Sequence, residues 1–134
     1  MMYISADEIE NYITQSPDPR LLREVIQLVR TMFPEEDLRY FDNGRTFSAI
    51  VLGMNPHPSP GYEEAGILNV SAQKNYVALY FYGINSNWQG PFPKSAVGRG
   101  CLRIKNQKFF VKYEEDIREI LKLLSYGKPH DMRD

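Results

Sequence analysis

Cysteine, histidine and long apolar runs are scarce in this sequence. Its single cysteine, Cys101, excludes an internal disulfide, and its two histidines lack the spacing of metal ligands. The longest apolar stretches, at 47–54 and 76–82, fall far short of the roughly 20 residues that a membrane-spanning helix needs. Residues 1–10 lack the basic start and apolar core of a secretory signal. We therefore expect a cytoplasmic protein.

The length of 134 residues fits one domain that folds without a metal or a disulfide. We expect this domain over residues 1–127 and a frayed C-terminal tail over 128–134.

Acidic residues are absent from a stretch that carries six basic ones. The formal net charge is only −1, yet residues 1–67 hold eleven acids and five bases, and the rest holds six acids and eleven bases. This segregation predicts a dipolar domain whose basic half faces its own acidic half or a negatively charged partner. The basic run consists of Lys94, Arg99, Arg103, Lys105, Lys108 and Lys112.

Two helices are predicted near the N-terminus. Ser5 and Glu8 have the spacing of a capping box, which would start a helix over 6–15. Asp18 and a following proline suit the start of a second helix, whose apolar residues recur at helical spacing as far as Met32.

The middle of the chain has the twofold periodicity of strands, at 46–54, 67–73, 76–82 and 101–104. Polar and apolar residues alternate in the second of these, which predicts one solvent-exposed face, and a short connection predicts a hairpin with the third. A final helix is expected over 113–126. Consecutive strands between terminal helices indicate an α+β fold, an antiparallel sheet of about four to five strands covered on one face by the N-terminal and C-terminal helices. Two long loops, at 55–64 and 83–97, interrupt the sheet, and loops of this length often carry function.

Three segments in order resemble the YdhG-like family of small bacterial domains, of which some members are described as frataxin-like iron chaperones. They are Met-Phe-Pro-Glu-Glu at 32–36 followed by Tyr40, Lys-Asn-Tyr-Val-Ala-Leu-Tyr-Phe-Tyr-Gly at 74–83, and Gly-Arg-Gly-Cys-Leu-Arg-Ile at 98–104. The resemblance implies a YdhG-like α+β domain, iron as the bound ion, and an iron-acceptor protein as partner. Relative to this family, the Pro-rich loop from Asn55 looks like an insertion.

Iron binding needs clustered carboxylates, because ferrous and ferric ions are hard enough to bind several oxygen ligands. Acids at the starts of helices are equally expected from the helix dipole, with no metal involved. The candidate metal ligands are Asp7, Glu8, Glu10, Glu35, Glu36 and Asp37.

Binding of an anion or of single-stranded nucleic acid is an alternative, in which bases would stack on tyrosines and the basic segment 94–112 would contact phosphates. A pI near 6.1 and the acids directly after the basic run count against nucleic acid. A second alternative is a small molecule in an aromatic cleft between the 76–82 strand and the tryptophan-bearing loop. The candidate residues for these ligands are Tyr76, Tyr80, Tyr82, Trp88, Arg99, Arg103 and Lys105.

Catalysis has no motif behind it, since the sequence shows no Ser/His/Asp arrangement, paired carboxylates or cofactor fingerprint. Cys101 has basic neighbours that would favour a thiolate, but free cysteine is more often a small buried core residue. We therefore expect a binding domain, a monomer or a homodimer, whose partner is an acidic protein or an iron acceptor.

Overall fold

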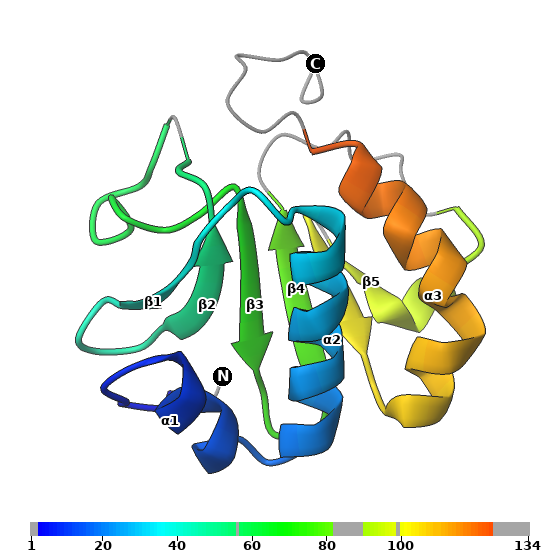
Figure 1. Ribbon diagram of the computed structural model, residues 1–134, viewed down its shortest axis with the longest axis horizontal. Helices are drawn as coiled ribbons and strands as arrows, with labels where there is room; N and C mark the ends of the chain where they lie inside the picture. Colours follow the sequence, from blue (N-terminus) through cyan, green and yellow to red (C-terminus); the bar gives the residue numbers. More distant parts are fainter. Residues whose placement is uncertain (1–2, 56, 82–89, 99, 125–134) are drawn as a thin grey trace.

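The computed structural model describes residues 3–55, 57–81, 90–98 and 100–124 (Figure 1). Two helices precede four strands, and two further strands and a long helix follow. In chain order the elements are α1 (Ile9–Gln15), α2 (Pro19–Met32), β1 (Leu38–Asp42), β2 (Ser48–Leu52), β3 (Leu68–Ala72), β4 (Val77–Phe81), the short 3₁₀ helix η1 (Lys94–Ala96), β5 (Val97–Gly98), β6 (Cys101–Ile104) and α3 (Gln107–Lys122).

The strands form one sheet in the order β1-β2-β3-β4-β6-β5, in which every neighbouring pair is antiparallel. The predicted α+β fold and the β3–β4 hairpin are confirmed. The sheet has six strands rather than four to five, since it also contains β1 and the two-residue β5, which the sequence pattern did not predict. No helix in the described ranges is long and apolar enough to cross a bilayer.

Helices α2 and α3 lie on the same face of the sheet, α2 over its centre and α3 over β5 and β6 (Figure 1). Helix α2 begins as predicted, because the Asp18 carboxylate accepts the Leu21 N–H at 3.1 Å and a proline occupies the first turn. Its buried stripe packs on strand residues such as Ile50, Val70 and Leu79, which form the main core with it. The helix-covered face of the sheet is therefore the main hydrophobic core.

Two helix starts differ from the sequence prediction. The capping box is wrong, because α1 begins only at Ile9 and the Glu8 side chain makes no capping hydrogen bond. Helix α3 begins at Gln107 rather than 113, because the Asn106 side chain caps it by accepting the Phe109 N–H at 2.8 Å.

The segment before α1 is held on β1 through a carboxylate. Asp42 accepts hydrogen bonds from the Tyr3 hydroxyl at 2.7 Å, the Tyr40 hydroxyl at 2.9 Å and the Gly44 N–H at 2.6 Å. Burial alone would raise the pKa of Asp42, but the three hydrogen bonds together lower it below its usual value. The chain before α1 is thus tied to the edge strand by hydrogen bonds to a charged group.

The second face of β3 is buried, so the expected solvent-exposed face is wrong. Asn69, Ser71 and Gln73 are 8%, 0% and 5% exposed. Their polar groups are satisfied within the fold, because Ser71 Oγ donates to the Ser48 carbonyl and Gln73 Nε2 donates to Ser71 Oγ. Alternating polarity predicts exposure only where nothing lies on the polar face. At Asn69 the loop between β2 and β3 lies on that side, because Asn69 is hydrogen-bonded to Gly66 and shares a pocket with Ser59 and Tyr62.

Candidate functional site

A small aromatic cluster lies on the sheet face opposite the helices. Its buried members alternate along the chain with the residues of β2 that face the main core. The Phe47 ring contacts Tyr62 of the β2–β3 loop at 5.7 Å between centroids, and Tyr80 of β4 edge-on at 5.8 Å. The Phe41 ring of β1 completes the cluster at 6.1 Å from Phe47 and 6.3 Å from Tyr62. A loop residue thereby becomes part of a packed layer on this face.

The β2–β3 loop is anchored at its base by Arg39. The guanidinium of this β1 residue donates from both terminal nitrogens to the Gly53 carbonyl, at 2.8 and 3.1 Å, and from one of them to the Glu64 carbonyl at 2.8 Å. The Asn55 N–H also donates to the Ala65 carbonyl at 3.1 Å. One side chain therefore joins both ends of the loop to the sheet.

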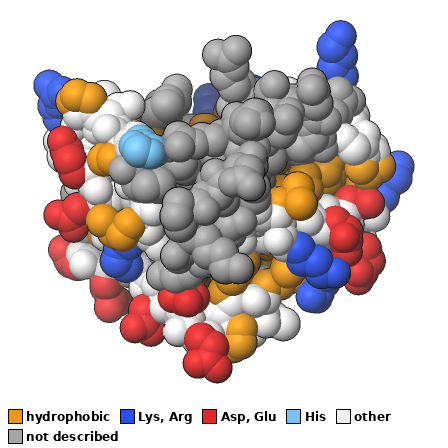
Figure 2. Space-filling model, turned by 90° about the horizontal axis from the view of Figure 1, so that it is seen from above, with side chains coloured by type: hydrophobic (Ala, Val, Ile, Leu, Met, Phe, Trp, Pro, Cys, Tyr) orange, Lys and Arg blue, Asp and Glu red, His pale blue; other side chains and the backbone are white. Residues whose placement is uncertain are grey.

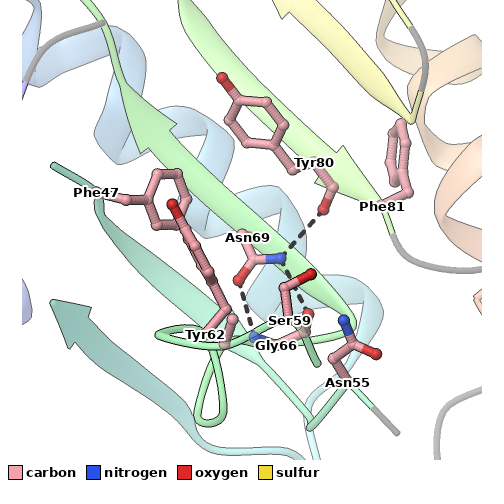
Figure 3. A pocket seen from close by; sticks show the side chains of 9 residues that line it. Phe47, Asn55, Ser59, Tyr62, Gly66, Asn69, Tyr80 and Phe81 are labelled. Carbon is pink, nitrogen blue, oxygen red and sulfur yellow. Dashed lines mark hydrogen bonds between the residues drawn. The ribbon is translucent and has the colours of Figure 1, made fainter. Parts of the chain in front are cut away.

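Asn69 of β3 fixes the far end of the same loop. Its Oδ1 accepts the Gly66 N–H at 2.8 Å, and its Nδ2 donates to the Gly66 carbonyl at 3.0 Å and to the Tyr80 carbonyl at 3.5 Å (Figure 3). Gly66 has no room for a side chain, because a Cβ there would lie 2.5 Å from the Leu52 carbonyl oxygen. The loop therefore leaves the sheet at a tightly packed and fully hydrogen-bonded position.

A pocket of about 350 Å³ lies between this loop and the sheet (Figure 3). Aromatic rings form much of its wall, with Phe47 before β2, Tyr62 on the loop, and Tyr80 and Phe81 on β4. Besides the hydroxyls of the two tyrosines, the polar side chains in the described wall are those of Asn55, Asn69 and Ser59, beside Ala65 and Gly66. An aromatic pocket with few, uncharged polar groups is the usual form of a small-molecule site.

Burial controls the ionisation of the groups beside this pocket. Burial raises the pKa of Tyr80 to about 12, and the neighbouring Cys101 and Tyr76 add to the shift while Arg103 opposes it. Burial also raises the pKa of the Cys101 thiol, against the smaller effect of Arg103. Cys101 is 6% exposed, so the interpretation as a buried core residue is confirmed. The raised pKa favours the protonated thiol over the nucleophilic thiolate.

The structure separates the predicted ligand residues. Tyr80 lines the aromatic pocket, whereas Tyr76 and Lys105 line a different, more polar hollow of about 220 Å³ near the start of α2. Arg103 is half-buried, and its guanidinium donates to the Ser95 carbonyl at 3.4 Å. The other three predicted ligand residues, Tyr82, Trp88 and Arg99, lie outside the described residues. The pocket thus lies on the predicted tyrosine strand, but its described wall comes from the β2–β3 loop.

The predicted carboxylate ligands do not converge. In the ranges that the structure describes, no three Asp, Glu, His or Cys side chains are grouped so as to hold a metal ion. Glu10 forms an ion pair with Arg23 at 2.7 Å, while Asp7, Glu8, Glu35 and Asp37 are exposed and Glu36 is half-buried. Iron binding through these acids stays a prediction.

Charge pairing is local rather than between the two halves of the chain. The ion pairs among described residues join Arg20 to Glu24 and Arg23 to Glu10 in the N-terminal half, or neighbours within α3. Figure 2 shows acidic and basic side chains intermingled around the rim of one face of the molecule. Neither observation supports an ion-paired contact between an acidic and a basic half.

Comparisons with protein-family models, curated proteins and solved structures found no match.

Sequence reasoning missed most of the pocket. Asn55, Ser59, Tyr62 and Asn69 were not among the predicted site residues, and Arg39 was not recognised as the anchor of the loop. The one available signal was the length and proline content of the 55–64 loop. Asn69 was hidden because a polar residue at an alternating strand position is normally solvent-facing.

Proposed function

We propose that the protein binds a small molecule, without catalysis, in the aromatic pocket between the β2–β3 loop and strands β3 and β4. The proposal rests on one observation: aromatic rings from the loop and from the sheet together line a cavity of about 350 Å³. That volume lies at the lower end of the range for ligand sites.

The anchoring of the loop supports the same function. Arg39 and Asn69 hold the two ends of the loop with hydrogen bonds of 2.8 to 3.1 Å to its backbone. The prolines of the loop, among them Pro58 and Pro60, restrict the backbone further. A wall that is ordered before the ligand arrives reduces the entropy lost on binding.

Iron handling, implied by the YdhG-like resemblance, and anion binding through the basic segment remain the two other candidate functions. Among the described residues the acids are not grouped. Lys105 lines only the smaller and more polar hollow of about 220 Å³ beside Tyr76, and Arg103 lines neither that hollow nor the aromatic pocket.

An NMR titration of the full chain tests the proposal. Five small probes are added singly, namely indole, oxindole, indole-3-acetate, tryptamine and caprolactam. We expect at least one to shift the signals of Phe47, Tyr62 and Tyr80 with saturation in the millimolar range or below. Tyr80→Leu removes one aromatic wall and should weaken that binding by about twofold to tenfold, given roughly 0.5–1.5 kcal/mol for an aromatic contact beyond its buried area.

Tyr76→Leu is the matched control, because Tyr76 lies on the same face four residues away and lines a different hollow. It should bind the probe as the wild type does. If no probe saturates these signals, or if both variants lose binding equally, the pocket is not the binding site.

A further inference from the structure

The described residues of the pocket wall carry no formal charge. They are aromatic, small, or bear an amide or a hydroxyl, and none of them is Asp, Glu, Lys, Arg or His. Burial raises the pKa of the Tyr80 hydroxyl to about 12, so that this phenol is neutral at physiological pH. A charged ligand would lose hydration here without gaining a counter-charge, which is strongly unfavourable. The lining therefore selects for an uncharged molecule.

Two charged side chains of the loop and its anchor, Arg39 and Glu63, are engaged outside the described pocket wall. The guanidinium of Arg39 donates to the carbonyls of Gly53 and Glu64. The Glu63 carboxylate accepts the Gly61 N–H at 3.1 Å within its own turn. These interactions hold the loop, and neither side chain is among the described residues of the pocket wall.

Volume and wall shape favour a flat ring system. A cavity of about 150 Å³ holds one benzene ring, so about 350 Å³ suits two fused rings. The rings of Phe47, Tyr62 and Tyr80 are tilted against one another by 52° and 76°. This arrangement offers both ring faces and ring edges to a planar ligand, and aromatic pairs are stabilised in both geometries.

Neutral hydrogen-bonding groups gather on the loop side. Asn55 Oδ1 accepts the backbone N–H of His57 at 2.8 Å. The side-chain NH₂ group of Asn55 is then left to donate to a ligand. Within the described residues, no hydrogen bond engages that nitrogen or the Ser59 hydroxyl. Figure 3 shows both side chains projecting from the loop beside Asn69, whose own amide is held by Gly66. One edge of the cavity is thus polar and the rest is aromatic.

We propose that the ligand is an uncharged, planar, two-ring heteroaromatic molecule with hydrogen-bonding atoms along one edge. This inference rests on the proposed function, since it specifies the ligand class of the same pocket. The rings of the ligand pack on Phe47, Tyr62 and Tyr80, and its polar edge meets Ser59 and Asn55 on the loop.

The five probes differ in the properties that the inference specifies. Indole is flat, uncharged and has a single N–H, and oxindole adds a carbonyl on the same edge. Indole-3-acetate and tryptamine place a negative or a positive charge on the same ring system, while caprolactam keeps the polar amide but is puckered. We expect oxindole to bind at least tenfold more tightly than the charged probes and caprolactam, and severalfold more tightly than indole.

Ser59→Ala tests the polar edge. Ser59 is exposed, so its truncation leaves the fold intact, and it should weaken oxindole severalfold while leaving indole nearly unchanged. Ser95→Ala, another exposed serine that does not line the pocket, is the control and should change neither affinity.

The outcomes separate the two proposals. If a charged probe or caprolactam binds at the pocket as tightly as oxindole, the ligand class is wrong while small-molecule binding stands. If oxindole loses no affinity in Ser59→Ala, the polar edge is wrong. If none of the five probes binds, both proposals fall together.

Discussion

The hydroxyl of Tyr12 holds two strands together where their own hydrogen bonding stops. Strands β2 and β3 pair as far as Ile50 opposite Val70, and the same register places Ser48 opposite Ala72. At that level the Tyr12 hydroxyl lies between the strands, accepting the Ala72 N–H at 2.8 Å and donating to the Ser48 carbonyl at 3.0 Å. A side chain of α1 thus replaces a missing backbone pair in the middle of the sheet.

Tyr12→Phe removes that bridge and keeps the ring. The Ala72 N–H then has no partner in a site where the tyrosine is 0% exposed, and an unsatisfied buried donor costs about 1–3 kcal/mol. The Ser48 carbonyl keeps the hydrogen bond from Ser71 Oγ, so losing the tyrosine hydroxyl costs less free energy there than at the Ala72 N–H. We expect the free energy of unfolding to fall by about 2 kcal/mol, a large share of the roughly 5–15 kcal/mol that stabilises a domain.

Urea unfolding at pH 7, followed by far-UV circular dichroism, measures the change. Tyr113→Phe is the control, because its ring packs against Phe109 at 4.6 Å and its hydroxyl makes no hydrogen bond within the described residues. It should change the free energy of unfolding by less than about 0.5 kcal/mol. The bridging role is refuted if the two variants are equally stable, or if Tyr12→Phe changes the slope of unfolding rather than its midpoint.

Three further changes follow from the structure. Gly66→Ala should lower the free energy of unfolding by about 2 kcal/mol or more in the same assay, because the new methyl group meets rigid backbone rather than flexible side chains. The pKa values of Tyr40 and Tyr80 are about 12 in the folded chain against 10.0 normally. The stability that the two protonated tyrosines give the fold is therefore intact below pH 10 and is lost as the pH rises toward 12. Tyrosinate absorbance and circular dichroism should therefore change together in that range, and tyrosinate formation near pH 10 without unfolding would contradict this. The pKa of Asp42 is lowered from 3.8 in the folded chain. The stability that the ionised carboxylate gives the fold is therefore present above pH 3.8 and is lost as the pH falls through the pKa of the folded chain. Asp42→Asn should accordingly lose less stability than the wild type between pH 6 and pH 3, as judged by urea midpoints.

The fold was predictable from sequence where the determining contacts are local. Helix α2 was located because Asp18 caps it three residues away and its apolar residues recur on one face. Helix α3 was placed six residues too late, because its cap, Asn106, and its first core residue, Phe109, stand among lysines that resemble a solvated loop. Strand β1 was missed because its sequence, Leu-Arg-Tyr-Phe-Asp, does not alternate regularly between apolar and polar residues, in keeping with the half-burial of all five.

The candidate site was much less predictable, because it depends on contacts between distant residues. Arg39 reaches Glu64 across 25 positions, and Tyr12 reaches Ala72 across 60. No periodicity or spacing in a single sequence encodes such a pair. The loop between β2 and β3 could be recognised as long and proline-rich, but not as the wall of a pocket. Only the folded chain shows that this loop turns back over the sheet and buries Asn69.

The uncharged lining also distinguishes the three candidate functions by their response to salt. Nucleic-acid binding through Arg103 and Lys105 would release counterions and weaken steeply as salt rises. Iron binding through exposed carboxylates such as Glu35 would also weaken, because exposed charges are screened within about 10 Å at 0.1 M salt. A neutral ring in an uncharged pocket has no net charge to screen, and the hydrogen bonds that hold the loop run to backbone carbonyls and amides. The affinity of oxindole should therefore stay constant within about twofold between 50 and 500 mM salt, and a steep decrease would mean that charged side chains, rather than the aromatic pocket, bind the ligand.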